Sequence, residues 1–210
     1  RGAVGTSTQR AGRSSEPVIN RARVLVISGP SGAGKGTLIE RILPRFPGLT
    51  VAVSATTRAK RRGEVDGENY HYMTSEAFAQ AVRDGQFLEH VEYAGNRYGT
   101  LRSEVDRHLA AGRSVVVEIE LKGARAIRSM LPDAVTVFIA PPSMSELTRR
   151  LEDRNTDSAG EIAARLEVST RELAAMGEFD HRVVNDDLAT ATQELIDVVA
   201  AEIGTDPVES

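Results

Sequence analysis

The chain has 210 residues, 40% hydrophobic and 27% charged, which is enough for one sizeable core but not for two large domains. Its net charge of −4 gives no general attraction to nucleic acid or to an anionic membrane, so a phosphate ligand would need a local cluster of cations. The absence of cysteine excludes disulfides and thiolate metal sites and favours the cytoplasm. No apolar stretch approaches the roughly 18 residues of a membrane span, so we expect no membrane partner.

The first segment, residues 1–20, is rich in Gly, Ser, Thr and Arg, and its few apolar residues follow no helical or strand period. This composition predicts a disordered basic tail, with a phosphate-binding arm as the alternative. After this segment, short β-branched runs alternate with helical patterns. The predicted strands are 24–28, 50–54, 114–120, 134–140 and 181–185. The predicted helices are 35–43, 75–84, 101–111, 121–130, 143–153, 160–176 and 188–203, and Ser143 with Glu146 forms a capping box.

This alternation is typical of βαβ units and predicts an α/β fold of three layers, with helices on both faces of a mostly parallel five-stranded sheet. Two stretches interrupt it. Residues 54–100 hold a charge-dense loop and no clean single period, so we expect a small inserted subdomain there. Residues 150–161 include a polar run without apolar anchors, which suits a mobile lid. The core would then comprise 21–53, 101–149 and 162–206.

The stretch GPSGAGK at 29–35 directly follows the first predicted strand and opens a helix. It fits the pattern G-x-x-x-x-G-K of a phosphate-binding loop, in which inward-facing backbone N–H groups and the helix N-terminus attract anions. Lys35 would reach the outer phosphates of a nucleoside triphosphate. An ordinary glycine-rich turn is the alternative, and the spacing does not fit a dinucleotide-binding turn. The candidate ATP-binding residues of this loop are Gly29, Pro30, Ser31, Gly32, Ala33, Gly34, Lys35, Gly36 and Thr37.

One position departs from the usual loop. Gly36 stands where a Ser or Thr hydroxyl usually meets Mg²⁺, and Thr37 comes one residue later. Either Thr37 substitutes for that hydroxyl, or the nucleotide phosphates and water hold the ion.

A second basic cluster lies in the predicted subdomain, where four cations occur within five positions, from Arg58 to Arg62. Two guanidinium groups with the hydroxyls of Tyr70 and Tyr98 could clamp a phosphate monoester. A solvated basic loop, balanced by Glu64 and its acidic neighbours, is the alternative, and charge alone favours it.

The motifs SATTRAKRRGEVDGENYHY, FLEHVEYAGNRYGT, LKGARAIR, VFIAPPS and VVNDDL follow the phosphate-binding loop in this order. Together they resemble the guanylate kinases, over about residues 22–203. The resemblance implies a nucleoside monophosphate kinase with a core, a GMP-binding subdomain and a lid. It implies Mg²⁺-dependent transfer of the γ-phosphoryl group of ATP to GMP, giving ADP and GDP, and leaves dGMP use and oligomeric state open.

Carried over by position, the resemblance puts Arg58 and Arg61 on the GMP phosphate, with hydroxyl bonds from Tyr70 and Tyr98. It puts Glu89 opposite N1–H and the exocyclic amine of guanine. A carboxylate there would reject adenine, because the adenine edge presents an unprotonated N1. Ser54 and Thr100 would lie near the base.

Glu118 and Glu120 end the apolar strand 114–120, so both carboxylates are expected to project from one face into the crevice at the carboxyl ends of the strands. They are candidates for GMP contact and for ordering the water of Mg²⁺. The family usually has aspartates at this pair, and a solvated strand end is the alternative.

The resemblance also implies a group of arginines that close over the transferring phosphate, namely Arg150, Arg154 and Arg165. Asn185 matches a position near the adenine of ATP, although Asn before Asp-Asp is also ordinary turn chemistry. We therefore interpret Lys35, Arg58, Arg154 and Arg165 as catalytic.

Two other functions remain as alternatives. A guanylate-kinase-like interaction module would bind partner peptides without phosphoryl transfer, but such modules typically lose the phosphate-binding loop that is present here. A related kinase could phosphorylate a ribose phosphate or another nucleoside monophosphate, and the set Glu89, Ser54 and Thr100 argues against it.

Overall fold

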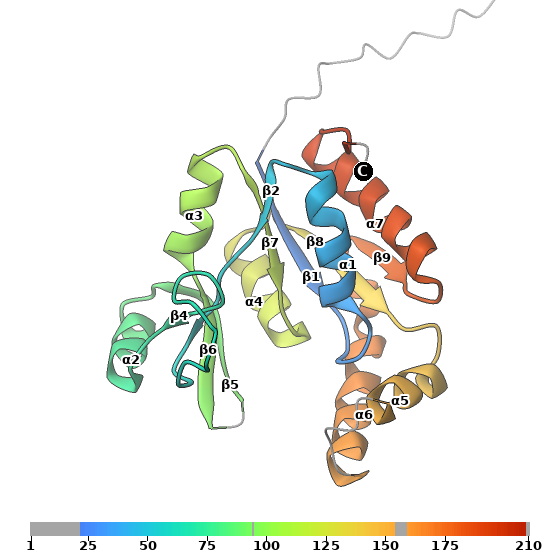
Figure 1. Cartoon of the computed structure of the whole chain (residues 1–210), viewed down its shortest axis with the longest axis horizontal. Helices are drawn as coiled ribbons and strands as arrows, with labels where there is room; N and C mark the ends of the chain where they lie inside the picture. Colours follow the sequence, from blue (N-terminus) through green and yellow to red (C-terminus); the bar gives the residue numbers. More distant parts are fainter. Residues whose placement is uncertain (1–21, 94, 154–158, 209–210) are drawn as a thin grey trace, which may run out of the picture.

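A five-stranded parallel sheet, in the order β2-β7-β1-β8-β9, forms the centre of the molecule (Figure 1). The computed structural model describes residues 22–93, 95–153 and 159–208, so the predicted tail and Arg154 lie outside the described residues. The strands are β1 (Val24–Ser28), β2 (Leu49–Val51), β7 (Ser114–Glu118), β8 (Val135–Ala140) and β9 (His181–Val184). The predicted fold class is confirmed.

Alternate residues of the central strand enter different apolar layers. Leu25 and Ile27 join the layer covered by α1 and α7, while Val24 and Val26 join the layer covered by α3 and α4. A continuous apolar run is therefore stable here because helices exclude water from both faces of the sheet. These helices are α1 (Lys35–Ile42), α3 (Arg102–Ala110), α4 (Leu121–Met130) and α7 (Leu188–Ile203), and a 3₁₀ turn, η1 (Leu43–Arg45), extends α1.

Two further helices stand beside the carboxyl ends of the strands (Figure 1). They are α5 (Met144–Glu152) and α6 (Ala159–Ala174), followed by the 3₁₀ turn η2 (Met176–Glu178). Ser143 caps α5 by accepting a hydrogen bond from the N–H of Glu146 (3.1 Å). Only this half of the predicted capping box forms, because the Glu146 carboxylate pairs with Arg149 and Arg150 instead.

A second sheet, in the order β4-β3-β6-β5, lies to one side of the first (Figure 1). Its strands are β3 (Ala55–Thr56), β4 (His71–Tyr72), β5 (Phe87–Tyr93) and β6 (Asn96–Leu101), and α2 (Ser75–Arg83) packs on it. The rings of Phe78 and Phe87 stack with their centroids 4.4 Å apart. A register shift between Phe87 and Glu89 explains why this segment shows no clean period.

The structure differs from the sequence prediction at one strand end that matters for the site. The predicted strand 114–120 stops at Glu118, and Glu120 is the residue before the first turn of α4. The expectation that Glu118 and Glu120 end the same strand is therefore wrong. Glu118, Ile119 and Glu120 alternate between charged and apolar, as residues of a strand do. This pattern continues past the point at which the backbone leaves the sheet.

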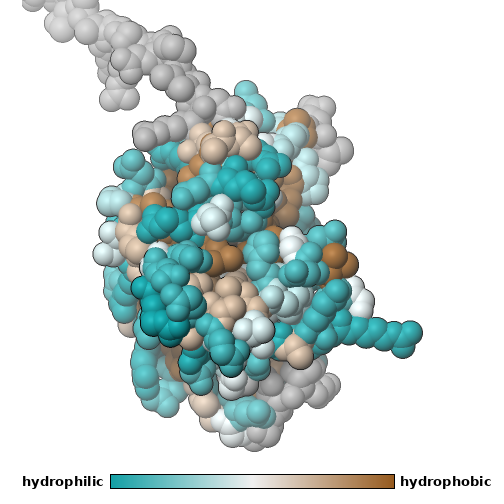
Figure 2. All heavy atoms as spheres, turned by 90° about the vertical axis from the view of Figure 1, so that its left-hand side faces the viewer, coloured by the Kyte–Doolittle hydropathy of each residue, from teal (hydrophilic) through white to brown (hydrophobic). Residues whose placement is uncertain are grey.

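The side of the molecule that carries the second sheet is mainly hydrophilic, with apolar atoms visible between the polar side chains (Figure 2). Among the described residues, no helix has both the length and the apolar character to cross a membrane.

Candidate active site

The phosphate-binding loop joins β1 to α1 and depends on its glycines. Gly29 and Gly34 have φ angles of 144° and 90°, a region that L side chains rarely adopt. A Cβ atom at Gly29 would overlap the carbonyl oxygen of Ile139, and one at Gly34 would overlap the side-chain amide of Asn185. The loop therefore approaches β8 and the residue that follows β9 more closely than any other residue type allows.

Lys35 is the first residue of α1 and lies over this loop. Its ammonium group donates hydrogen bonds to the carbonyl oxygens of Gly29 (2.6 Å) and Pro30 (3.2 Å). The first turn of α1 contains no acidic residue, and its N-cap residue, Gly34, has no side chain to cap the helix. The loop thus combines a lysine with the positive end of a helix, which is an arrangement that attracts phosphate.

Asn185 and Arg150 support the loop from behind. The Asn185 side chain, 6% exposed, donates a hydrogen bond from Nδ2 to the carbonyl oxygen of Ala33 (2.8 Å). Arg150 donates to the backbone oxygen of Asn185 (2.9 Å) and pairs with Glu146 (2.8 Å). Both residues were expected to contact ATP, and the structure gives them a second role as supports of the loop.

Arg165 extends from α6 toward two parts of the site. One guanidinium nitrogen donates to the hydroxyl of Ser31 in the phosphate-binding loop (3.2 Å), and another donates to the hydroxyl of Tyr93 in β5 (3.4 Å). A single side chain of α6, just after the predicted lid, therefore contacts both the phosphate-binding loop and the second sheet.

Arg58 lies in the predicted phosphate clamp, but a carboxylate of the same loop already pairs with it. Its two outer nitrogens donate to the oxygens of Glu64 at 2.7 and 3.1 Å. Tyr72 (2.6 Å) and the backbone N–H of Arg61 (2.7 Å) also donate to Glu64. These bonds, with that from Arg58 the strongest, lower the pKa of Glu64 to about 2.

Aromatic rings hold Arg58 in this position. The guanidinium lies 5.3 Å from the centre of the Tyr70 ring and 5.9 Å from that of Tyr72. The rings of Tyr70 and Tyr98 meet edge to face at 6.0 Å. The structure thus brings together three of the four residues expected to bind the GMP phosphate, while the Arg61 side chain is exposed.

Glu89 is a buried carboxylate at the irregular start of β5, with 8% of its surface exposed. Thr100 donates a hydrogen bond to its Oε1 atom (2.8 Å). Burial raises the pKa of Glu89, the nearby charge of Glu120 raises it further, and the bonds from Thr100 lower it. A carboxylate has about four lone-pair sites, so Glu89 can still accept hydrogen bonds from a ligand with donors.

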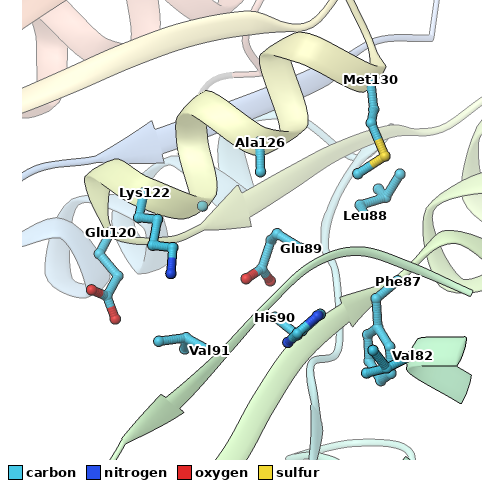
Figure 3. Close-up of a pocket in the computed structure, with 11 residues that line it drawn as sticks. Val82, Phe87, Leu88, Glu89, His90, Val91, Glu120, Lys122, Ala126 and Met130 are labelled. Carbon is cyan, nitrogen blue, oxygen red and sulfur yellow. The ribbon is translucent and has the colours of Figure 1, made fainter. Parts of the chain in front are cut away.

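Glu89 lines a cavity of about 380 Å³ between β5 and α4, which also includes Glu120 and Lys122 (Figure 3). Glu118, by contrast, lies beside the phosphate-binding loop, with Oε2 3.8 Å from the place of a Cβ atom on Gly36. The two carboxylates that were expected to act as a pair therefore lie in different places, one at the cavity of Glu89 and one beside the phosphate-binding loop. Ser54 is partly buried, and its backbone oxygen accepts a bond from His71 (2.9 Å).

A bound Mg²⁺ would depend mainly on nucleotide phosphates and water. Within the described part of the chain, no group of three or more His, Asp or Glu residues is arranged to hold a metal ion. Two candidate oxygen ligands beside the loop are the carboxylate of Glu118 and the hydroxyl of the exposed Thr37. Mg²⁺ keeps several of its waters when it binds to a protein. One carboxylate together with the phosphates of a bound nucleotide is therefore sufficient to hold it.

Sequence reasoning missed two residues of the site. Glu64 was considered only as a balancing charge, and Tyr72 was not considered. Nothing in the sequence pattern indicates that Tyr72 and Arg58 both bind the Glu64 carboxylate.

Comparison with known proteins points in one direction. The sequence model of the guanylate kinase family matches residues 21–202. A guanylate kinase of Rubrobacter xylanophilus is 48% identical over 190 residues, which cover 90% of this chain and 100% of that protein. One from Parasynechococcus marenigrum is 52% identical over 170 residues, covering 81% and 93%. The crystal structure of guanylate kinase from Anaplasma phagocytophilum has a TM-score of 0.67 at 30% identity, covering 90% of this chain and 91% of that one.

Proposed function

The chain belongs to the guanylate kinase family, and we propose that its site transfers the γ-phosphoryl group of ATP to GMP, giving ADP and GDP. The observation that carries the choice of GMP is Glu89, a buried carboxylate that accepts a hydrogen bond from Thr100 and lines a cavity. Guanine offers two adjacent donors, N1–H and the exocyclic amine, to such a group. Adenine offers an acceptor at N1, which would leave a buried carboxylate unpaired.

The acceptor phosphate would bind at Arg58, with Tyr70 and Tyr98 adding hydroxyl groups. A phosphate dianion matches the planar fork of an arginine, as the Glu64 carboxylate does in this structure. Phosphate binding therefore requires Arg58 to exchange one oxyanion partner for another or to share them. We assign Arg61, which is exposed on the same loop, as a second phosphate ligand.

The donor triphosphate would lie in the phosphate-binding loop, on the N–H groups at the start of α1, with Lys35 turning from Gly29 and Pro30 to the outer phosphates. Arg165 approaches the same loop at Ser31. The transition state of phosphoryl transfer spreads charge over three equatorial oxygens, and these fixed cations would stabilise it. No general base is required, because the attacking oxygen of GMP is already anionic. Excluding water from this site would prevent hydrolysis of ATP.

We also propose that the reaction depends on Mg²⁺, which neutralises charge on the transferring phosphates when it is bound. Glu118 is the residue that we assign to its water shell, with Thr37 as the alternative donor, because Gly36 offers no hydroxyl. Glu120 lines the cavity of Glu89, so we assign it to GMP. The absence of cysteine supports a cytoplasmic location.

The test is formation of ADP by the purified protein with ATP and Mg²⁺, with GMP, dGMP, AMP, CMP, UMP and ribose phosphates offered separately. We expect turnover with GMP and not with AMP or the pyrimidine nucleotides. Equal turnover of AMP and GMP would contradict the role of Glu89. Binding of GMP without any turnover would favour an interaction module instead.

A further inference from the structure

Glu104 is a buried carboxylate for which the proposed reaction has no role. It lies in the first turn of α3, with 4% of its surface exposed. The next residue, Val105, is buried in the apolar layer that α3 and α4 cover, so this helix is fixed to the core. A buried carboxylate is costly unless hydrogen bonds or opposite charges compensate it, and its partners therefore indicate what it does.

Two connections of the chain join the core to the second sheet, and Glu104 lies beside both. The first connection runs from the end of β2 to the start of β3 and includes Val53. The backbone N–H of Val53 donates a hydrogen bond to Oε1 of Glu104 (3.4 Å). The second connection is the junction at which β6 passes directly into α3 (Figure 1), and Glu104 is the third residue of that helix. The carboxylate therefore fastens one connection to the other.

Glu104 also contacts a strand of the second sheet. Its Oε2 atom lies 3.3 Å from Nε2 of His71 in β4. An ionised carboxylate only accepts hydrogen bonds, so the ring nitrogen donates in this contact. The backbone N–H of His71 donates to the oxygen of Ser54 (2.9 Å), which belongs to the first connection. His71 is therefore bonded to the junction of the core and the second sheet through both its side chain and its backbone.

Two further residues of α3 hold the Glu104 carboxylate in place. Arg107 donates a hydrogen bond to Oε2 (2.8 Å), and Nε2 of His108 lies 3.1 Å from Oε1. Burial raises the pKa of Glu104, but the hydrogen bonds from Arg107, His108 and the N–H of Val53 outweigh burial and lower this pKa below its ordinary value. Glu104 is therefore ionised at neutral pH and remains an acceptor for the groups that reach it from the second sheet.

His71 lies between the two tyrosines that hold Arg58. Successive side chains of a strand point to opposite faces of the sheet. The ring of His71 accordingly faces α3, while the ring centres of Tyr70 and Tyr72 lie 5.3 and 5.9 Å from the guanidinium of Arg58. The contact of His71 with Glu104 therefore fixes the segment that carries both tyrosines relative to the core.

We propose that Glu104 is a positioning residue, which holds the second sheet at a fixed orientation to the core through Val53 and His71. The phosphate-binding loop belongs to the core, whereas Arg58 follows β3 and Glu89 lies in β5 of the second sheet. Phosphoryl transfer between them depends on this orientation, because a misplacement of about 1 Å can lower a rate about 100-fold. The proposal rests on the proposed function only for its kinetic test.

The orientation is tested by electron spin resonance as the distance between two spin labels on the full chain. Ala77→Cys, exposed on α2, and Glu194→Cys, exposed on α7, place one label on each side of the junction, and the chain has no cysteine of its own. We expect a narrow distance distribution without further substitution, and one about twofold wider or displaced by about 2 Å or more in His71→Ala and Glu104→Ala. Asp106→Asn, at an exposed position of the same helix, is the matched control and should keep the narrow distribution. The same distribution in all four proteins would overturn the proposal.

The consequence for the reaction is tested by kcat at saturating ATP and GMP, together with calorimetry of GMP binding. We expect kcat per GMP site to fall by about tenfold or more in Glu104→Ala and in His71→Ala. The dissociation constant of GMP should stay within about threefold of wild type, because Arg58 and Glu89 keep their places within the second sheet and its loop. His71→Gln retains an N–H donor and should recover most of kcat, and Asp106→Asn should leave kcat unchanged.

A merely structural glutamate would instead reduce the amount of folded protein. This would appear as a lower Tm and fewer GMP sites in calorimetry, with kcat per site unchanged, and that result in His71→Ala and Glu104→Ala would overturn the proposal. If Glu104→Ala does not fold, His71→Ala decides alone, because the half-buried His71 can be removed while Val53, Arg107 and His108 still bind the carboxylate. Failure of the proposed function would appear separately, as wild-type protein that makes no GDP, and the distance measurement would still decide the role of Glu104.

Discussion

The guanidinium of Arg58 binds the carboxylate of Glu64 through two hydrogen bonds, of 2.7 and 3.1 Å, from its two outer nitrogens to the two carboxylate oxygens. This relationship explains how a loop with four clustered cations keeps a defined shape before a phosphate arrives. The carboxylate also takes a bond from Tyr72 (2.6 Å), so it links the cation to the second sheet. The pKa of Glu64 is about 2, below the ordinary value for glutamate. The stabilisation from this link is therefore fully present above the pH at which a glutamate ordinarily titrates, and it is lost as the pH falls toward 2.

Arg58→Lys should impair GMP use strongly, because a lysine keeps the charge but cannot offer two parallel donors. We expect kcat/KM for GMP to fall by about 100-fold, the loss of a charge-assisted pair of hydrogen bonds. The KM for ATP should change little. Arg62→Lys is the control, since Arg62 is exposed on the same loop and should show wild-type kinetics. Equal effects of the two substitutions would argue against a specific clamp at Arg58.

The KM for GMP should rise as the pH falls, and it should do so above the ordinary pKa of glutamate. The reason is that burial raises the pKa of Glu89, and a protonated carboxyl cannot accept from both donors of guanine. Thr100→Val removes a bond that lowers this pKa, so it should move the rise in KM to a still higher pH. The measurement is KM for GMP between pH 5 and pH 8 in both proteins. A KM profile that is flat in Thr100→Val, or shifted to lower pH, would contradict the assignment.

The raised pKa of Glu89 predicts that its ionised carboxylate lowers the stability of the protein while it provides selectivity for guanine. A carboxyl whose pKa is raised on folding binds its proton more tightly in the folded state, so stability decreases as the pH rises from the ordinary glutamate pKa through the folded value. At neutral pH the ionised Glu89 therefore destabilises the protein. Glu89→Gln should raise Tm at pH 7 and lower kcat/KM for GMP by about 100-fold or more. The Tm difference should vanish below pH 4, and a Tm lower than wild type at pH 7 would refute this sign.

Asn185→Ala should loosen the phosphate-binding loop. It removes the bond from Nδ2 to the carbonyl oxygen of Ala33 and leaves that buried oxygen without its partner. We expect a loss of about 1–3 kcal/mol in stability, the cost of an unsatisfied buried group. The KM for ATP should rise while the KM for GMP stays nearly constant. Asp186→Ala, at the exposed neighbouring position, should alter neither, and an unchanged Tm in Asn185→Ala would show that the support is dispensable.

The strands of the core sheet were predictable because each is a short apolar, β-branched run in the sequence. The run at Val24–Ser28 is apolar, β-branched and ends at a glycine, and the structure begins and ends β1 at the predicted residues. The helix Leu121–Met130 was likewise predicted at both ends. The residue pattern within each of these elements determines its type and its burial. That pattern can be recognised in a single sequence.

The contacts that organise the site were not predictable in this way. Asn185 and Ala33 are 152 residues apart, and nothing in either segment indicates that the two meet. Glu64 has the composition of a solvated loop residue, and only the fold shows that it fills the Arg58 fork. The end of β7 was misplaced because Ile119 continues the alternation of apolar and charged residues after the backbone has turned toward α4. In each case the missing information is a distance between elements, which periodicity does not contain.

Lys35→Met should abolish phosphoryl transfer while leaving the fold intact. The side chain is replaced by one of similar length without charge, so the loop loses the ammonium that would neutralise the outer phosphates. We expect kcat to fall by at least about 1,000-fold, comparable with the loss of a major electrostatic contact to the transition state. The affinity for GMP alone, measured by calorimetry, should stay close to wild type, because Glu89 and Arg58 lie in the other sheet and its loop. The loss of the bonds to the carbonyl oxygens of Gly29 and Pro30 should lower Tm by the modest amount expected for hydrogen bonds in partly buried surroundings. A variant that is folded, binds GMP normally and still makes GDP at more than a tenth of the wild-type rate would exclude Lys35 from the reaction.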